Sequence, residues 1–300
     1  MSRALIVSDG RPGHLNQSLA LAKYLGITAD VHEVSPRFRW SKALSYLLDK
    51  AGIYTGRLFT GHDQVHTSVK YDLVIGAGSS TYYMTKVLAK ELGAKSVTMM
   101  LPRGYHYDFD LIFAPKHDNP PVRPNLVEIP ANFAYVEPHG IYQTSKRSIG
   151  IVIGGDNKVF SMSEKLLQEQ LDAIIAHYGD YEVAVTTSPR TPESVVSMLK
   201  KYAFDYSVIY SEDPVNPIPD FLDQCETVFI TSDSTSMISE AVSYGSANVI
   251  VLPLESDRES KFTRLVDTLE KEGYLSVYDG TFKEVNRKID FSKYAKRVML

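Results

Sequence analysis

The chain has 300 residues, of which 44% are hydrophobic and 23% are charged, and its formal net charge is −4. This length predicts two domains, and this composition supports a buried core in each. Coating nucleic acid requires a basic surface, so the acidic balance predicts no nucleic-acid partner. The one cysteine, Cys225, excludes an internal disulfide and a cysteine-rich metal site. We expect it to be a small buried hydrophobic residue in a reducing compartment.

No run of about 18 apolar residues occurs, so the sequence predicts no membrane span. The apolar part of the starting stretch MSRALIVSDG is too short for a signal peptide and is typical of a first strand. We therefore expect a cytoplasmic protein.

Short runs rich in Val and Ile recur along the whole chain. They are continuous rather than alternating, which is typical of parallel strands that are covered by helices on both faces. The predicted strands are residues 4–7, 71–78, 96–101, 110–115, 149–155, 181–188, 227–233 and 248–254. Helical patterns alternate with them at residues 17–25, 79–92, 163–177, 192–202, 236–244 and 260–272. This order predicts an α/β fold of two Rossmann-like domains with open, doubly wound sheets, facing each other across a cleft.

A polar stretch, EPHGIYQTSKRS, separates the two halves. We place the boundary inside it, which gives an N-terminal Rossmann-like domain at residues 1–142 and a C-terminal one at residues 143–300. The final segment, FSKYAKRVML, is expected to form a helix that packs back on the N-terminal domain.

The loop SDGRPGHLNQS follows the first predicted strand, at the edge where open α/β sheets bind ligands. Gly10 and Gly13 let the backbone approach a ligand closely. The dinucleotide fingerprint GxGxxG and the phosphate loop GxxxxGK[ST] are both absent, so neither a nicotinamide enzyme nor a P-loop NTPase is favoured. Imidazole titrates near neutral pH, so His14 is a candidate general base, with Asp9 as the alternative base.

A purely structural interpretation of this loop stays open. It is a glycine-rich turn in which Asn16 or Ser18 caps the following helix. His14 is then hydrogen-bonded across the turn rather than exposed to a substrate.

Two loops of the C-terminal half predict an anion site. In GGDNKVF, Gly154, Gly155 and Lys158 form a candidate phosphate seat, with backbone N–H donors and one ammonium. In TTSPRTP, Ser188 and Arg190 offer a hydroxyl and a guanidinium to the same anion. The alternative for TTSPRTP is an ordinary exposed turn.

The segment SDSTSMISEA joins the end of a predicted strand to the start of a helix. Its hydroxyls, from Ser232, Ser234, Thr235 and Ser236, cap the helix or hold a phosphate. Glu240 lies in the first turns, where it can accept hydrogen bonds from the vicinal hydroxyls of a ribose. The alternative is a capping-box glutamate, although a box needs a spacing of three residues and Ser236 lies four before Glu240.

The carboxylates of Asp9, Asp156 and Asp233 belong to separate loops, and no HExxH motif occurs. The sequence therefore predicts no tightly bound catalytic metal.

Five segments together resemble the Elm-type mitochondrial fission family and its bacterial relatives: SDGRPGHLNQS, FAPKHD, IGGDNK, TTSPRTP and SDSTSMISEA. The resemblance covers most of the chain and implies a glycosyltransferase fold of the GT-B class. It implies a donor nucleotide in the C-terminal domain, with Glu240 holding the ribose, and an acceptor in the N-terminal domain. The loop also resembles the glycine-rich loop with a histidine of muramyl-lipid N-acetylglucosaminyltransferases, which implies that Gly10, Gly13 and His14 border the reaction centre.

We therefore expect a GT-B glycosyltransferase that moves a sugar from a nucleoside-diphosphate sugar to a cell-envelope glycan or lipid-linked acceptor. The donor is a substrate, and no metal or other cofactor is expected. The alternatives are a nucleoside-diphosphate-sugar epimerase of the same fold and a non-catalytic GT-B-like scaffold linked to membrane fission. The residues expected to line the acceptor side are Gly10, Arg11, Gly13, Asn16, Gln17, Gly78 and Ser79.

The segment SPRFRWSKALSYLLDKAGIYTGRLF, residues 35–59, combines aromatic and basic side chains. Its charged residues are Arg37, Arg39, Lys42, Lys50 and Arg57 against one acid, Asp49. In an acidic protein, this pattern predicts peripheral contact with an anionic membrane at its inner face, or a grip on a phosphorylated lipid acceptor. The alternative is an amphipathic helix packed on the first sheet, with its charges in solvent.

Overall fold

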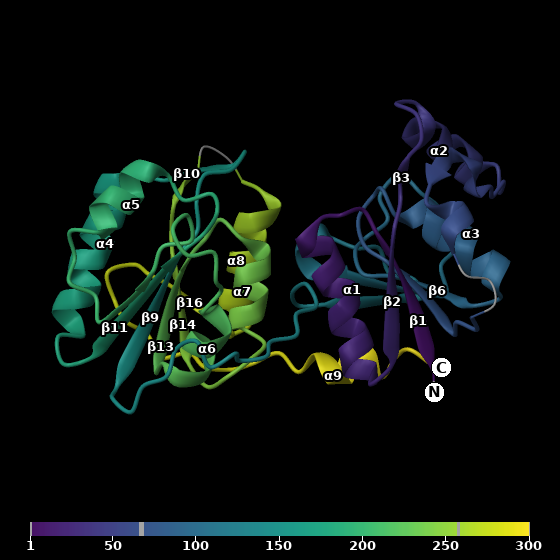
Figure 1. Ribbon diagram of the computed structural model, residues 1–300. Coiled ribbons are helices and arrows are strands. Elements are labelled where there is room, and N and C mark those ends of the chain that lie inside the picture. Colours follow the sequence, from purple (N-terminus) through teal and green to yellow (C-terminus); the bar gives the residue numbers. More distant parts are fainter. Residues whose placement is uncertain (1, 66–68, 257–258, 300) are drawn as a thin grey trace. The chain divides into compact units, whose positions relative to one another are not determined.

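The chain folds into two compact units (Figure 1). The computed structural model describes residues 2–65, 69–256 and 259–299. The first unit runs to Tyr135 and includes the segment from Asp290 onward, and the second unit is Val136–Ile289. The sequence placed the join between residues 142 and 143; the contacts within each unit separate the chain between Tyr135 and Val136.

The first unit is built on a six-stranded parallel sheet with the strand order β2-β1-β5-β6-β7-β8. Its strands are β1 (Arg3–Ser8), β2 (Thr28–Glu33), β5 (Leu73–Gly76), β6 (Lys95–Thr98), β7 (Leu111–Pro115) and β8 (Leu126–Ile129). Helices α1 (Pro12–Leu25) and α9 (Phe291–Ala295) cover one face, and α3 (Tyr82–Leu92) covers the other (Figure 1). Helix α2 (Ser41–Lys50) packs beside α3, next to the two-stranded sheet of β3 (Ser35–Pro36) and β4 (Phe59–Thr60). Short 3-10 helices are η1 (Gly56–Leu58), η2 (His62–Gln64) and η3 (Lys116–Asp118).

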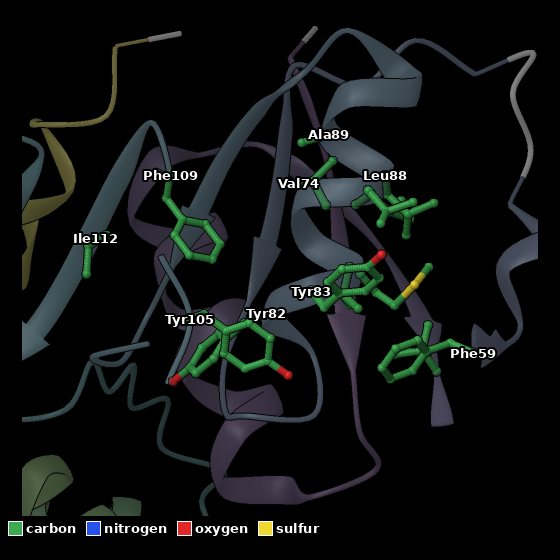
Figure 2. Packing of buried hydrophobic residues seen from close by; sticks show 14 of the residues in the cluster. Phe59, Val74, Tyr82, Tyr83, Leu88, Ala89, Tyr105, Phe109 and Ile112 are labelled. Carbon is green, nitrogen blue, oxygen red and sulfur yellow. The ribbon is translucent and has the colours of Figure 1, made fainter. Parts of the chain in front are cut away.

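Aromatic rings hold the start of α3 against the connection between β6 and β7 and against β4. Tyr82 meets Tyr105 and Phe109 edge-on, with ring centroids 5.9 and 6.2 Å apart, and Tyr83 stacks on Phe59 at 6.0 Å (Figure 2). Each such pair adds roughly 0.5–1.5 kcal/mol to the gain from burying the rings. These contacts hold the first turn of α3 and therefore the end of the loop that leads into it.

The second unit contains a six-stranded parallel sheet with the strand order β12-β11-β9-β13-β14-β16. Its strands are β9 (Ser148–Ile153), β11 (Glu182–Thr187), β12 (Tyr206–Val208), β13 (Thr227–Thr231), β14 (Asn248–Leu252) and β16 (Ser276–Val277). Figure 1 shows α4 (Glu164–His177) and α5 (Glu193–Leu199) on one face, and α6 (Ile218–Gln224), α7 (Thr235–Ala241) and α8 (Lys261–Lys271) on the other. Strands β10 (Phe160–Ser161) and β15 (Glu255–Ser256) pair separately. The α/β class and the doubly wound order predicted from the sequence are confirmed.

One buried carboxylate holds the start of the second unit. Asp220, on α6, is 1% exposed and accepts hydrogen bonds from four consecutive backbone N–H groups. The donors are His139, Gly140, Ile141 and Tyr142, at 2.7, 2.9, 2.8 and 3.3 Å. Charge-assisted hydrogen bonds of this kind are about twice as strong as neutral ones. They attach residues 139–142 to the second unit.

The strand order reverses once in each sheet, between β1 and β5 in the first and between β9 and β13 in the second. In open α/β folds, ligands bind outside the carboxyl ends of the strands at such a switch point. The loops after β1 and β5 carry SDGRPGH and GAGSS, and those after β9 and β13 carry GGDNK and SDSTS. Three of the loops that the sequence analysis selected, together with the loop that contains Gly78 and Ser79, therefore lie in pairs at the two switch points.

Candidate functional site

Helix α1 places His14 beside the carboxyl end of β1. The helix begins at Pro12, which is favoured at the first helical position because it lacks an N–H group and has a fixed φ. The prediction that the helix begins at residue 17 is wrong, and so is the alternative that Asn16 or Ser18 caps it, since both lie inside the helix. His14 is therefore in the first turn.

His14 and Asp9 form a hydrogen-bonded pair. The Nδ1 atom of His14 lies 3.0 and 3.1 Å from the two carboxylate oxygens of Asp9. The Asp9 side chain is 6% exposed and that of His14 is 20% exposed. A carboxylate at this distance selects the tautomer that carries the proton on Nδ1 and leaves Nε2 as an acceptor. Among the residues that the structure describes, none hydrogen-bonds to Nε2.

Gly78, in the loop after β5, supports the His14 ring from the other side of the switch point. A Cβ atom at Gly78 would lie 2.3 Å from Cε1 of His14, and the φ angle of Gly78 is +88°. Only glycine fits both the backbone angle and the contact with the ring. The two loops that the sequence analysis assigned to the acceptor side are thus in contact through these two residues.

Other residues expected on the acceptor side have different surroundings. Gln17 is 4% exposed and donates through Nε2 to the carbonyl of Gly13 at 3.0 Å, inside α1. Arg11 is exposed, with Nε 3.8 Å from Asp9, and Asn16 is exposed on α1. Gly10 has a φ of +75° and donates its N–H to the hydroxyl of Ser8. These contacts give Gln17 and Gly10 structural roles in shaping the loop.

Lys42, on α2, is a cation of this region that the sequence analysis placed in the basic segment 35–59 and not beside the loop after β5. Its Nζ donates to the hydroxyls of Ser79 and Ser80 at 2.8 and 3.4 Å. No carboxylate among the described residues pairs with it, and Ser79 directly follows Gly78. The chain separation of 37 residues hid this contact, although the basic character of the segment was visible.

In the second unit, Asp233 joins the loop after β13 to the loop after β9. Its carboxylate accepts from the N–H of Gly155 at 3.0 Å and from the hydroxyl of Thr231 at 2.6 Å, and that hydroxyl accepts from the N–H of Gly154 at 2.7 Å. A Cβ at Gly154 would lie 2.0 Å from a carboxylate oxygen of Asp233. The two amides that we assigned to an anion therefore already have partners inside the unit.

Arg190 also binds Asp233 and the loop after β9. Its Nη2 lies 2.7 Å from Oδ2 of Asp233, whose side chain is fully buried, and its Nη1 donates to the carbonyls of Gly155 and Asp156 at 3.2 Å. The hydroxyl of Ser188 accepts from the N–H of Arg190 at 3.2 Å. Both side chains thus brace the loop, and Arg190 does so through a buried carboxylate rather than as part of an ordinary exposed turn. Lys158 lies exposed in the loop after β9.

Helix α7 begins with hydroxyl side chains of two kinds. Ser232 is 7% exposed and accepts from the N–H of Leu254, and Ser234 caps the helix by accepting from the N–H of Met237. No hydrogen bond joins the hydroxyls of Thr235 and Ser236 to any described residue. These two hydroxyls are therefore available to a ligand.

Glu240 lies one helical turn after Ser236, so the two side chains share a face of α7. Burial alone raises the pKa of Glu240 to about 7, since no neighbouring charge contributes. The carboxylate has no hydrogen-bond partner among the described residues. Lys288 holds the end of the same helix by donating to the carbonyls of Ala241 and Ala247 at 2.8 Å. A desolvated carboxylate on a fixed helix is suited to accept hydrogen bonds from ligand hydroxyls.

Within the described ranges, no group of three or more His, Cys, Asp and Glu side chains is placed to hold a metal ion. The pair Asp108 and Asp110 has a spacing seen in metal sites, but Asp108 pairs with Lys86 and Asp110 accepts from Ser96. No helix over the same ranges is long and apolar enough to cross a bilayer. Cys225 is unpaired and buried, as expected.

Two solved structures share the fold. A protein described as a UDP-N-acetylglucosamine 2-epimerase from Listeria monocytogenes matches with a TM-score of 0.54 and 12% identity, covering 98% of this chain and 94% of its own. The glycosyltransferase SnogD from Streptomyces nogalater matches with a TM-score of 0.52 and 13% identity, covering 93% of this chain and 87% of its own. At these identities, the similarity establishes the GT-B fold.

Two comparisons of sequence agree with the resemblance carried by the loops. An uncharacterized protein of Rickettsia prowazekii (strain Madrid E), RP120, is 26% identical, over 83% of this chain and 82% of its own length. The family described as Mitochondrial fission ELM1 matches residues 12–298, which include every loop at the two switch points except the start of the first. The chain therefore belongs to the mitochondrial fission ELM1 family.

Proposed function

We propose that this chain is a glycosyltransferase that moves a sugar from a nucleoside-diphosphate sugar to a hydroxyl group of a cell-envelope glycan or lipid-linked acceptor. The observation that carries the proposal is the pair of His14 and Asp9 at the switch point of the first unit, with Nε2 of His14 left without a protein partner. A histidine held in this way is suited to accept a proton from an attacking hydroxyl.

In the proposed reaction, Nε2 of His14 takes the proton of the acceptor hydroxyl as its oxygen bonds to the anomeric carbon of the donor sugar. The bond from that carbon to the diphosphate breaks, and the nucleoside diphosphate leaves with the electron pair. The carboxylate of Asp9 stabilises the imidazolium through Nδ1–H, so Asp9 orients the base rather than replacing it.

For the donor, we propose that Glu240 accepts hydrogen bonds from the ribose hydroxyls. This is supported by its missing partners and by the burial that raises its pKa. The hydroxyls of Thr235 and Ser236 and the ammonium of Lys158 are proposed to hold the diphosphate, which offsets the charge of the leaving group without a metal. Gly154, Gly155, Ser188, Arg190, Ser232 and Ser234 are assigned to shaping these loops.

For the acceptor, we propose an anionic group close to the hydroxyl that reacts. Lys42 carries a positive charge to the loop of Gly78 and Ser79, and no described carboxylate neutralises it. A phosphorylated lipid fits this charge, since an ammonium binds phosphate as a point charge.

Sugar nucleotides labelled in the sugar, incubated with the protein and an extract of cell-envelope lipids, test the proposal. Label that moves into the lipid fraction, and that no longer moves with His14→Ala, supports transfer. The proposal is contradicted if the label stays in the sugar nucleotide for every donor tested.

The second candidate is a sugar-nucleotide epimerase, which the fold shared with the Listeria monocytogenes protein favours. An epimerase converts the donor without any acceptor, so a new sugar nucleotide in the absence of lipid identifies it. If neither product forms although a nucleotide binds, a non-catalytic scaffold is the remaining function.

A further inference from the structure

Helix α2 buries polar side chains beside its apolar ones. Its buried line is polar and consists of Ser41, Ser45 and Asp49, at a spacing of four residues. Each of these has polar partners inside the unit: Oγ of Ser45 lies 2.9 Å from the hydroxyl of Tyr105, and Asp49 pairs with Nζ of Lys86 at 2.7 Å. The helix is therefore held on the unit by hydrogen bonds and an ion pair as well as by its apolar flanks.

Some apolar side chains of this segment face solvent. The segment around α2 exposes Trp40 by 54%, Leu47 by 63%, Phe38 by 50% and Ile53 by 52%. Phe38 and Trp40 stack on each other with ring centroids 5.1 Å apart. Exposed large apolar side chains are normal singly, but several on one segment mark an interaction surface. Leu44, Tyr46 and Leu48 of α2 pack against the core of the first unit, so the exposed apolar side chains are additional to an inward-facing apolar side.

The same segment also exposes basic side chains. Arg39, Lys50 and Arg57 are exposed, and none forms an ion pair with a described residue. Arg37 lies 3.8 Å from Asp63, a weak surface contact. The one acid of the segment, Asp49, is buried against Lys86, so it does not reduce the charge at the surface. A segment that exposes both large apolar and basic side chains, in a chain of net charge −4, is complementary to an anionic bilayer.

We propose that the surface formed by Phe38, Trp40, Leu47, Ile53, Arg39, Lys50 and Arg57 docks on an anionic lipid membrane. We name it the α2 surface. The apolar side chains enter the headgroup region, and the basic ones remain at the lipid phosphates. This inference does not depend on the proposed glycosyl transfer.

The chain contains one tryptophan, Trp40, which makes the test direct. Vesicles of phosphatidylcholine with phosphatidylglycerol should shift its emission to shorter wavelength and pull the full chain into the vesicle pellet. Lipids with brominated chains should quench the same emission. Vesicles of phosphatidylcholine alone should do so much less, and added salt should reverse binding because it screens the basic side chains.

Variants of the α2 surface distinguish the contribution of its basic side chains to binding from that of its apolar side chains. Replacing Arg39, Lys50 and Arg57 together by Gln should lower the partition coefficient roughly a hundredfold, since each basic side chain near an anionic surface contributes about a factor of five. Leu47→Glu should lower it by about tenfold or more, because burial of one leucine is lost. Val122→Glu, at an exposed apolar residue of the same unit, is the matched control and should bind as the parent does.

Two results overturn the proposal. One is unchanged Trp40 emission with anionic vesicles. The other is a Trp40 shift that depends on protein concentration without lipid and that accompanies a doubling of mass in solution, which identifies a second copy as the occupant. The vesicle assay needs neither nucleotide nor acceptor. A negative vesicle result therefore does not bear on the proposed sugar transfer, and a negative transfer result does not bear on membrane docking.

Discussion

The Nδ1 atom of His14 lies 3.0 Å from Oδ1 of Asp9, and the opposite ring nitrogen has no hydrogen-bond partner among the described residues. Sequence reasoning treated the two residues as alternative bases. Their geometry makes them one unit, in which a buried carboxylate orients an imidazole. This distinction leads to different expectations for the two substitutions.

His14→Ala should lower kcat by about 10²–10⁴-fold, the usual contribution of a general base. Asp9→Asn should cause a loss of similar order although His14 is still present, because an amide that donates to Nδ1 favours the tautomer with the proton on Nε2. Steady-state sugar transfer measures both. His139→Ala, at an exposed histidine, should keep full activity. An Asp9→Asn variant as active as the parent would contradict the pair.

Gly78→Ala should impair activity more than it impairs stability. A methyl group there meets the His14 ring, and it also strains a backbone with φ of +88°. Gly93→Ala is a matched control, because Gly93 has a φ of +63° and nothing lies within 4 Å of its added Cβ. Both variants should lose roughly 1 kcal/mol of stability from the backbone strain. Only Gly78→Ala should also lose most of the transfer rate; equal rates would show that the ring does not need this contact.

Glu240→Gln should make stability less dependent on pH. Burial raises the pKa of Glu240 to about 7 from an ordinary value of 4.5, so between these values the folded chain binds more protons than the unfolded chain. The free energy of unfolding of the parent therefore falls as the pH rises through this window. At about pH 8 the variant should be more stable than the parent by about 1–3 kcal/mol. Near pH 4.5, where Glu240 is protonated in the folded chain, the difference in stability should be small.

Urea denaturation across this pH range measures the effect of Glu240→Gln. Glu164→Gln, at an exposed position, is the control and should show no such trend. A stability difference for Glu240→Gln that stays constant with pH would mean that the carboxylate is not desolvated.

Asp220→Asn should destabilise the chain by about 2–4 kcal/mol, because a neutral side chain replaces the carboxylate that four backbone N–H groups share. The amide keeps one acceptor and adds donors where only donors are present. Asp223→Asn, an exposed neighbour on the same helix, should change stability by less than about 0.5 kcal/mol. Chemical denaturation compares the two, and equal effects would show that Asp220 does not anchor residues 139–142.

The sequence predicted the inner strands of both six-stranded sheets and missed their edges. Every predicted strand corresponds to β1, β5, β6, β7, β9, β11, β13 or β14, whose neighbours cover them on both sides. The missed strands of these sheets are β2, β8, β12 and β16, and each lies at an edge. An edge strand needs no continuous apolar run; β2, with the sequence TADVHE, is partly exposed along its whole length. A continuous apolar run therefore detects strands that are buried on both faces of a sheet.

The sequence predicted which loops contain the candidate site residues, but not which of these residues contact one another. The sequence predicts Gly154 and Gly155 as phosphate ligands, because a glycine that leaves space for a phosphate and a glycine that leaves space for a carboxylate look the same in sequence. Asp233 lies 78 residues from Gly155, and nothing local links them. The burial of Ser45 and Asp49 on α2 could not be predicted for a similar reason, since their partners Tyr105 and Lys86 come from later segments.

The thermal stability of the parent and of Glu240→Ala, measured against a panel of nucleoside diphosphates and their sugars, tests the central claim most directly. A ligand at 100 times its dissociation constant adds about 2.7 kcal/mol to the stability of the folded chain. We predict that at least one nucleotide and its sugar conjugate raise the Tm of the parent, and that Glu240→Ala loses most of this rise. If no member of the panel stabilises the parent, the chain does not use a nucleotide-sugar donor, and the account is contradicted.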